Sequence, residues 1–93
     1  MNKEEFKARA NQRIDEISAK INEIKAKKEA VKSDAKQEFE KSLQELESRK
    51  TDLQSKYDDL LNATDEKWEN VKSTFSAAAD SFEEGFSKLS SLV

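Results

Sequence analysis

The chain contains no proline, cysteine or histidine, and its only glycine is Gly85. Proline and glycine are the residues that most often end a helix, so nothing before position 85 forces a helix to stop. The lack of cysteine removes disulfides and thiolate chemistry, and without histidine as well the usual zinc ligands are missing. Histidine is also the one side chain that titrates near neutral pH. We therefore expect a non-enzymatic protein with no catalytic residue, no cofactor and no metal site.

Long hydrophobic runs are missing too. No stretch approaches the roughly 20 apolar residues of a membrane span. The segment Met1-Asn2-Lys3-Glu4-Glu5 has no apolar core of the kind that a secretory signal needs. The expected location is the cytoplasm.

What the sequence does have is helical periodicity within a highly charged composition. Hydrophobic residues make up 34% of the chain and charged residues 40%, which suits a narrow apolar seam rather than a thick core. Apolar residues recur at steps of three and four, and such steps place side chains on one face of an α-helix. The pattern predicts an all-α coiled coil. The predicted packing and oligomer seam consists of Ile14, Ile17, Ile21, Ile24, Val31, Leu43, Leu46, Leu53, Tyr57, Leu60, Trp68, Val71, Phe75 and Phe82.

The best helix break lies at about 62–64, where Asn62 can end one helix and Thr64 can serve as the N-cap of the next. We therefore predict a single domain over 1–93. It has a long helix at about 3–61 and a shorter helix at about 65–90 that folds back as a helical hairpin. The returning helix would cover only the second half of the long one. The first isoleucines of the seam would then need another chain, which predicts a homo-oligomer, a dimer or larger.

Two other layouts are open. A further break at Ser33-Asp34, with Gln37 completing a capping-box pattern, would give three helices of similar length in a monomeric bundle. Alternatively, no break forms and the chain is a single helical rod.

Charge is unevenly distributed along the chain. Residues 1–50 carry 13 Lys and Arg against 11 Asp and Glu, a net of +2, whereas residues 51–93 carry 4 against 9, a net of −5. This asymmetry favours antiparallel or end-to-end contacts in which basic and acidic segments meet. It would guide orientation more than stability, because exposed ion pairs contribute little.

Three segments resemble a known family. They are Ala35-Lys36-Gln37-Glu38-Phe39-Glu40, Leu46-Glu47-Ser48-Arg49-Lys50 and Thr64-Asp65-Glu66-Lys67-Trp68-Glu69-Asn70-Val71-Lys72. Together they resemble the small bacterial and cyanobacterial coiled-coil proteins of a stress-response family. That family often has a glycine at the break, where this chain has Ala63-Thr64. The resemblance implies a cytoplasmic helical protein linked to stress, with no catalytic residue to carry over.

The expected function is self-association and helical protein–protein contact. An alternative is binding to a membrane surface through the amphipathic segment 65–93, although its acidic charge disfavours anionic lipid. Nucleic-acid binding is not favoured. The basic stretch of Lys20, Lys25, Lys27, Lys28 and Lys32 contains acidic residues and no aromatic ones.

Overall fold

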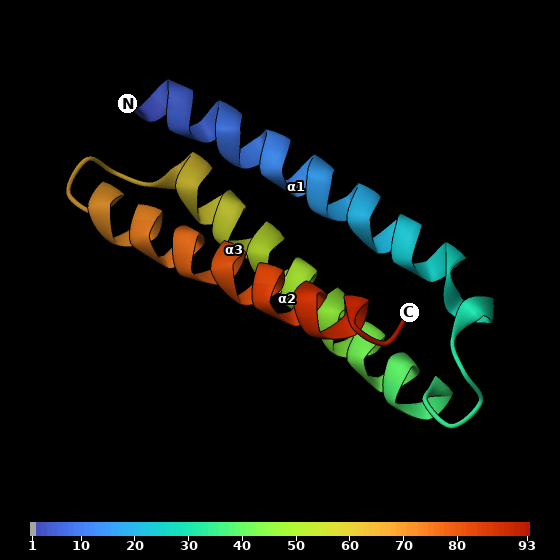
Figure 1. Ribbon diagram of the computed structural model, residues 1–93. Coiled ribbons are helices and arrows are strands. Elements are labelled where there is room, and N and C mark those ends of the chain that lie inside the picture. Colours follow the sequence, from blue (N-terminus) through green and yellow to red (C-terminus); the bar gives the residue numbers. More distant parts are fainter. Residues whose placement is uncertain (1) are drawn as a thin grey trace.

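The protein is an antiparallel bundle of three helices. In a computed structural model, which describes residues 2–93, the chain forms α1 (Lys3–Ala26), α2 (Lys36–Asn62) and α3 (Trp68–Ser90) (Figure 1). A short 3₁₀ turn, η1 (Lys28–Ala30), follows α1. The described residues contain no strand, so the all-α prediction is confirmed.

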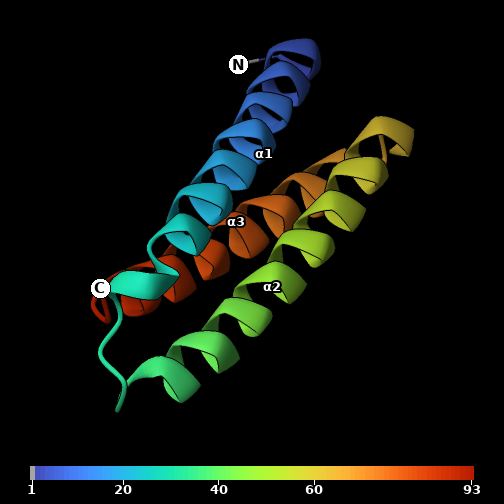
Figure 2. The same ribbon diagram turned by 90° about the vertical axis from the view of Figure 1, so that its right-hand side faces the viewer.

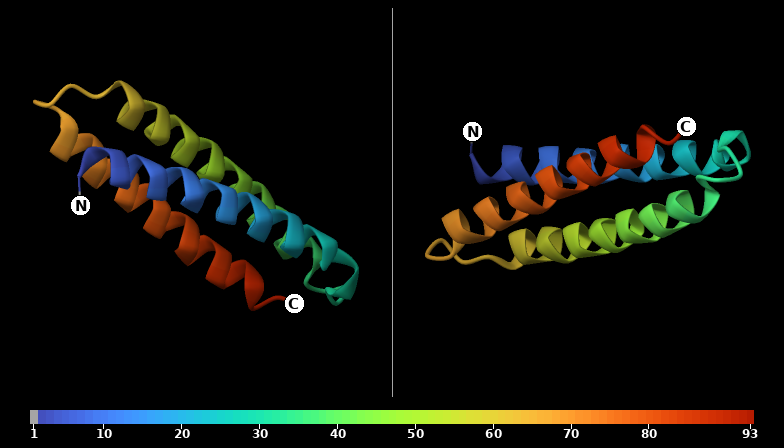
Figure 3. Two further views of the ribbon diagram at one scale, coloured as in Figure 1. Left: turned by 90° about the horizontal axis from the view of Figure 1, so that it is seen from above. Right: turned by 60° about the horizontal axis from the view of Figure 1, so that its bottom comes forward.

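The three helices lie along one another in a rod with principal extents of 50 × 17 × 16 Å. The α1–α2 connection lies at one end of the rod and the α2–α3 loop at the other (Figure 3). The N-terminus is therefore near the α2–α3 loop, and the C-terminus is near the α1–α2 connection. Figure 2 shows that α3 begins beside the end of α2 and runs obliquely towards the end of α1.

The predicted long helix over about 3–61 is wrong. Instead α1 ends at Ala26 and α2 begins at Lys36, and the chain turns back between them. No proline or glycine causes this turn. The reversal lets α2 and α3 cover the isoleucine face of α1 within the same molecule, and burying apolar surface is the dominant favourable term in folding. The layout of three similar helices, with 24, 27 and 23 residues, is the one that the structure adopts.

Helix ends differ from the expected capping. Only α1 has a side-chain cap, in which Asn2 Oδ1 accepts a hydrogen bond from the Glu5 backbone N–H. The N-cap positions of α2 and α3 are Ala35 and Lys67, and neither makes a side-chain cap, so the capping roles expected of Ser33-Asp34 and Thr64 are wrong. No described residue has a positive φ, and Asn62 is simply the last residue of α2. Packing of the apolar faces, rather than capping, sets these helix ends.

One hydrophobic core runs the length of the bundle. Seven large side chains in it are almost fully excluded from solvent, and they are Phe39, Phe82, Ile17, Leu46, Leu53, Leu60 and Leu89. No polar or charged residue is buried among the described residues. The core is therefore purely apolar, and all charged side chains remain at the surface.

Candidate functional site

The predicted seam is the core of this single molecule. The structure buries Ile14, Ile17, Ile21, Ile24, Val31, Leu46, Leu53, Leu60, Trp68, Phe75 and Phe82, and it half-buries Leu43, Tyr57 and Val71. The packing role of these residues is confirmed. The argument that the first isoleucines need another chain is wrong, because α2 and α3 of the same chain cover them.

Four buried residues lie outside the predicted seam: Ala10, Phe39, Ala79 and Leu89. Ala10, Phe39 and Leu89 follow the same steps of three and four, so the periodicity could have included them. Ala79 is different, since the periodic pattern points to its neighbour Ala78, which is only half-buried. The choice between two adjacent alanines depends on how α3 is rotated in the bundle.

The three helix pairs are not equally close. The backbones of α2 and α3 approach one another most closely, those of α1 and α2 less, and those of α1 and α3 least. Gly85 of α3 leaves room for Leu46 and Arg49 of α2, whereas the buried face of α1 consists mainly of isoleucines, which hold backbones apart. The bundle is therefore a tight α2–α3 hairpin with α1 laid along it.

Gly85 lies at a close contact between α3 and side chains of α2. A Cβ added there would lie 3.0 Å from Arg49 Nη1 and 3.3 Å from Leu46 Cδ1. Arg49 crosses α3 at this point, and its Nη1 donates a hydrogen bond to the Ser81 carbonyl oxygen at 2.6 Å. Glycine therefore leaves room for the arginine, even though glycine weakens a helix interior.

This close approach gives a testable expectation for Gly85→Ala. In an Arg49→Ala background we expect the free energy of unfolding to rise by about 0.5–1 kcal/mol, because alanine loses less conformational entropy in a helix than glycine. With Arg49 present the increase should be smaller, since the guanidinium must shift away from the new methyl group. Urea unfolding of the wild type, Gly85→Ala, Arg49→Ala and the double variant measures the coupling between the two positions. Equal increases in both backgrounds would contradict the role of Arg49.

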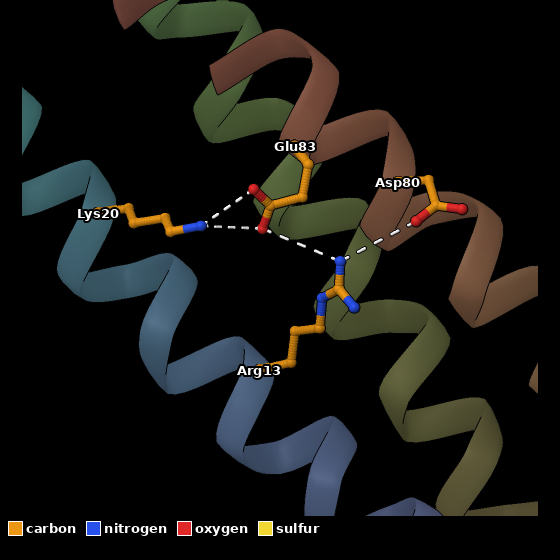
Figure 4. A network of polar contacts seen from close by, with 4 residues as sticks. All are labelled: Arg13, Lys20, Asp80 and Glu83. Carbon is orange, nitrogen blue, oxygen red and sulfur yellow. Dashed lines mark hydrogen bonds and ion pairs between the residues drawn. The ribbon is translucent and has the colours of Figure 1, made fainter. Parts of the chain in front are cut away.

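Charged side chains bridge the open α1–α3 seam (Figure 4). Lys20 Nζ lies 3.0 Å from Glu83 Oε2, and Arg13 Nη2 lies 4.0 Å from both Glu83 Oε1 and Asp80 Oδ1. These side chains are 36–82% exposed, so each pair contributes about 0–1 kcal/mol. The network therefore favours one alignment of α1 with α3 but adds little to the stability of the bundle.

In each ion pair that joins two segments of the bundle, the basic residue comes earlier in the sequence than the acidic residue. The other pairs are Lys3–Asp65, Lys25–Glu47 at 2.6 Å and Lys28–Glu40 at 3.0 Å. In every case the base lies within residues 3–28 and the acid within residues 40–83. The pairs of Lys3, Arg13 and Lys20 join the basic half of the sequence to the acidic half as expected, but within one chain, and α1 and α3 run parallel rather than antiparallel (Figure 3). The pairs Lys25–Glu47 and Lys28–Glu40 lie within residues 1–50.

An open groove lies between α1 and α3 near the N-terminus, with a volume of about 340 Å³. Phe6, Ala10, Phe75 and Ala79 provide its apolar lining, and charged side chains such as Arg13 flank it. At its end the Phe6 ring packs edge-on against Trp68, with ring centroids 5.8 Å apart. Trp68 thus anchors α1 to the start of α3. The polar part of the lining consists of Arg9, Arg13, Ser76 and Asp80.

The other charged features belong to the bundle surface. Within the basic stretch, Lys20, Lys25, Lys27 and Lys28 each form an ion pair with a glutamate. Across residues 2–93, no group of three or more carboxylates is placed to hold a metal ion.

Comparison with known proteins adds no relative. No protein-family model, curated protein or solved structure matches this chain. The resemblance to the stress-response family therefore stays a prediction from the sequence. Among the described residues, no helix has the length and apolar character that crossing a membrane requires.

Proposed function

We propose that this protein is non-enzymatic and acts through contacts between its helices and those of other protein molecules, including copies of itself. The observation that supports the proposal is the uneven attachment of α1. Its backbone is the farthest from α3, their seam opens into the groove, and exposed ion pairs bridge the rest. A helix that is held less closely than its neighbours is the one most available to another molecule.

The chemistry of the surface supports binding rather than catalysis. The groove offers an apolar lining, and the rest of the surface offers paired charges. Such a surface recognises a complementary helix through shape and charge. A role in bacterial stress response is part of the proposal only through the resemblance of segments such as Ala35–Glu40.

The competing proposal is binding to a lipid surface through residues 65–93. It would require α3 to leave the bundle, because Trp68, Phe75, Phe82 and Leu89 of α3 are buried against the other helices. Protein contact needs no such separation, and for this reason we favour it.

Light scattering over a wide range of protein concentrations tests the proposal. We expect the weight-average mass to rise from the 10.6 kDa of one chain towards twice that value as the concentration increases. A mass that stays at 10.6 kDa at every concentration would contradict self-association.

A further inference from the structure

The connection between α1 and α2 contains no residue that requires a turn. Its sequence from 27 to 35 is Lys-Lys-Glu-Ala-Val-Lys-Ser-Asp-Ala, and most of these residues favour helices. Ala35 is already in the right-handed helical region, with φ −102° and ψ −7°, whereas Lys27, with φ −90° and ψ 2°, lies outside it. Val31 is extended, with ψ 135°. Straightening the connection therefore requires at least Lys27 and Val31 to adopt helical angles.

The apolar pattern also continues through this connection. Val31 is buried, and Ala35 packs against the core. They follow Ile24 at seven and eleven residues, and Phe39 follows Ala35 at four, so all lie near one face of a continuous helix. Local preference therefore favours one helix from Lys3 to Asn62, while the folded monomer bends it. Such a conflict between local and global structure marks a place where a second state is close in free energy.

We infer that two copies of this chain can exchange α1 by straightening residues 27–35, which deepens the self-association proposed above. In the exchanged dimer each chain has one continuous helix over residues 3–62, and the two long helices run antiparallel. The α1 segment of one chain occupies the α1 position on the α2–α3 hairpin of the other. Domain swapping of this kind reuses the contacts of the monomer and changes only the hinge.

The contacts that hold α1 in the monomer all re-form between chains in this dimer. Ile17 and Ile21 return to the same core, and Lys20 again meets a Glu83, now of the other copy. α1 is the exchanging element because α2 and α3 form the closest pair in the bundle. Arg49 of α2 packs against Gly85 and is hydrogen-bonded to α3, which holds that pair together. Exchange requires α1 to leave its core temporarily, so it is slow, and dimers formed at high concentration persist after dilution.

The test compares proteins refolded from denaturant at high and at low concentration, followed by light scattering and small-angle X-ray scattering. A continuous helix of 60 residues, Lys3 to Asn62, is about 90 Å long at ~1.5 Å per residue. The monomer is 50 Å long. We expect a dimer of about 90 Å after refolding at high concentration, with slow return to monomer on dilution.

Proline variants of the two connections provide a matched pair. The Lys32 carbonyl accepts from the Ala35 N–H, and the Thr64 carbonyl accepts from the Lys67 N–H, so each connection ends in a similar turn just before a helix. Ser33 and Asp65 hold the second position of these turns, where proline is favoured. Ser33→Pro fits the monomer and prevents a straight helix, so we expect the dimer association constant to fall by at least about 100-fold. Asp65→Pro places the same residue in the connection that does not straighten, and we expect no change beyond about twofold.

A third variant should move the equilibrium the other way. Ser33→Ala with Asp34→Ala removes two side chains that favour turns, and we expect the dimer fraction to rise severalfold. A dimer that survives Ser33→Pro, or one that is no longer than the monomer, would overturn the exchange of α1 while leaving self-association intact. Monomers alone, in the wild type and in the double alanine variant, would overturn both proposals.

Discussion

Ile17→Asp should lower the free energy of unfolding by more than any other substitution that we propose. Ile17 is 0% exposed, and no buried polar group lies in the described core to receive a carboxylate. The substitution removes a large apolar side chain and buries an unpaired charge, so we expect a loss of more than about 5 kcal/mol. A chain of this size has a stability of roughly 5–14 kcal/mol, so the loss removes at least about a third of it and all of it at the low end of the range. Far-ultraviolet circular dichroism and urea unfolding measure the effect.

Ala19→Asp on the exposed side of α1 is the control for the same charge on the same helix. It should cost only about 0.5–0.7 kcal/mol, the difference in helix propensity. Comparing Ile17→Asp with Ala19→Asp distinguishes the three-helix bundle from the predicted hairpin that buries Ile17 only between chains. If Ile17 lay only on a seam between chains, Ile17→Asp would leave a folded monomer of nearly unchanged stability, and that result would contradict the structure.

Phe82→Ala should lower the free energy of unfolding by about 3–5 kcal/mol, because it leaves a cavity in a core that cannot fully collapse. Phe82 is 0% exposed at the middle of α3. One turn later Phe86 stacks on it, with ring centroids 6.4 Å apart, but Phe86 is only half-buried. Phe86→Ala should therefore cost about 1–2 kcal/mol, in proportion to the smaller apolar area that it buries.

The ranking of these two phenylalanines tests how α3 is rotated in the bundle. Phe82 lies on the predicted seam and Phe86 follows it at four residues, so helical spacing alone puts both near one face of α3. Thermal and urea unfolding of the two variants at the same pH and protein concentration give the comparison. An equal loss for Phe82→Ala and Phe86→Ala would mean that α3 faces the core differently from the structure described here.

The secondary structure could largely be predicted from the residues. Steps of three and four placed residues such as Ile17, Leu53 and Phe82 on apolar helix faces, and all of them are buried. The uneven charge predicted that basic and acidic segments would meet, as Lys20 and Glu83 do. The break between α2 and α3 was also expected close to its observed place, from Asn62 as a helix end and Thr64 as an N-cap, although Thr64 does not cap α3.

The candidate site could be predicted only in part. The groove between α1 and α3 combines Phe6 with Phe75, residues that are 69 positions apart, and their proximity depends on the topology of the bundle. The contact of Arg49 with Gly85 also depends on the topology. In the sequence alone, a single glycine near the end of a helix indicates only a position that weakens the helix. The break at Ser33-Asp34 was one of the open layouts, because its capping-box pattern with Gln37 competed with an apolar pattern that continues towards Phe39.

The sequence by itself determined that this chain forms amphipathic helices with a narrow apolar face and a charged surface, because those properties depend on spacing and composition within a few turns. Only the tertiary structure decided where the first helix ends and which molecule covers its isoleucines. A helix that continues through residues 27–35 satisfies the preferences of most residues there, but it leaves Ile14 to Ile24 exposed unless a second chain is present. In a single chain, burial of that face outweighs the helical hydrogen bonds lost at the bend.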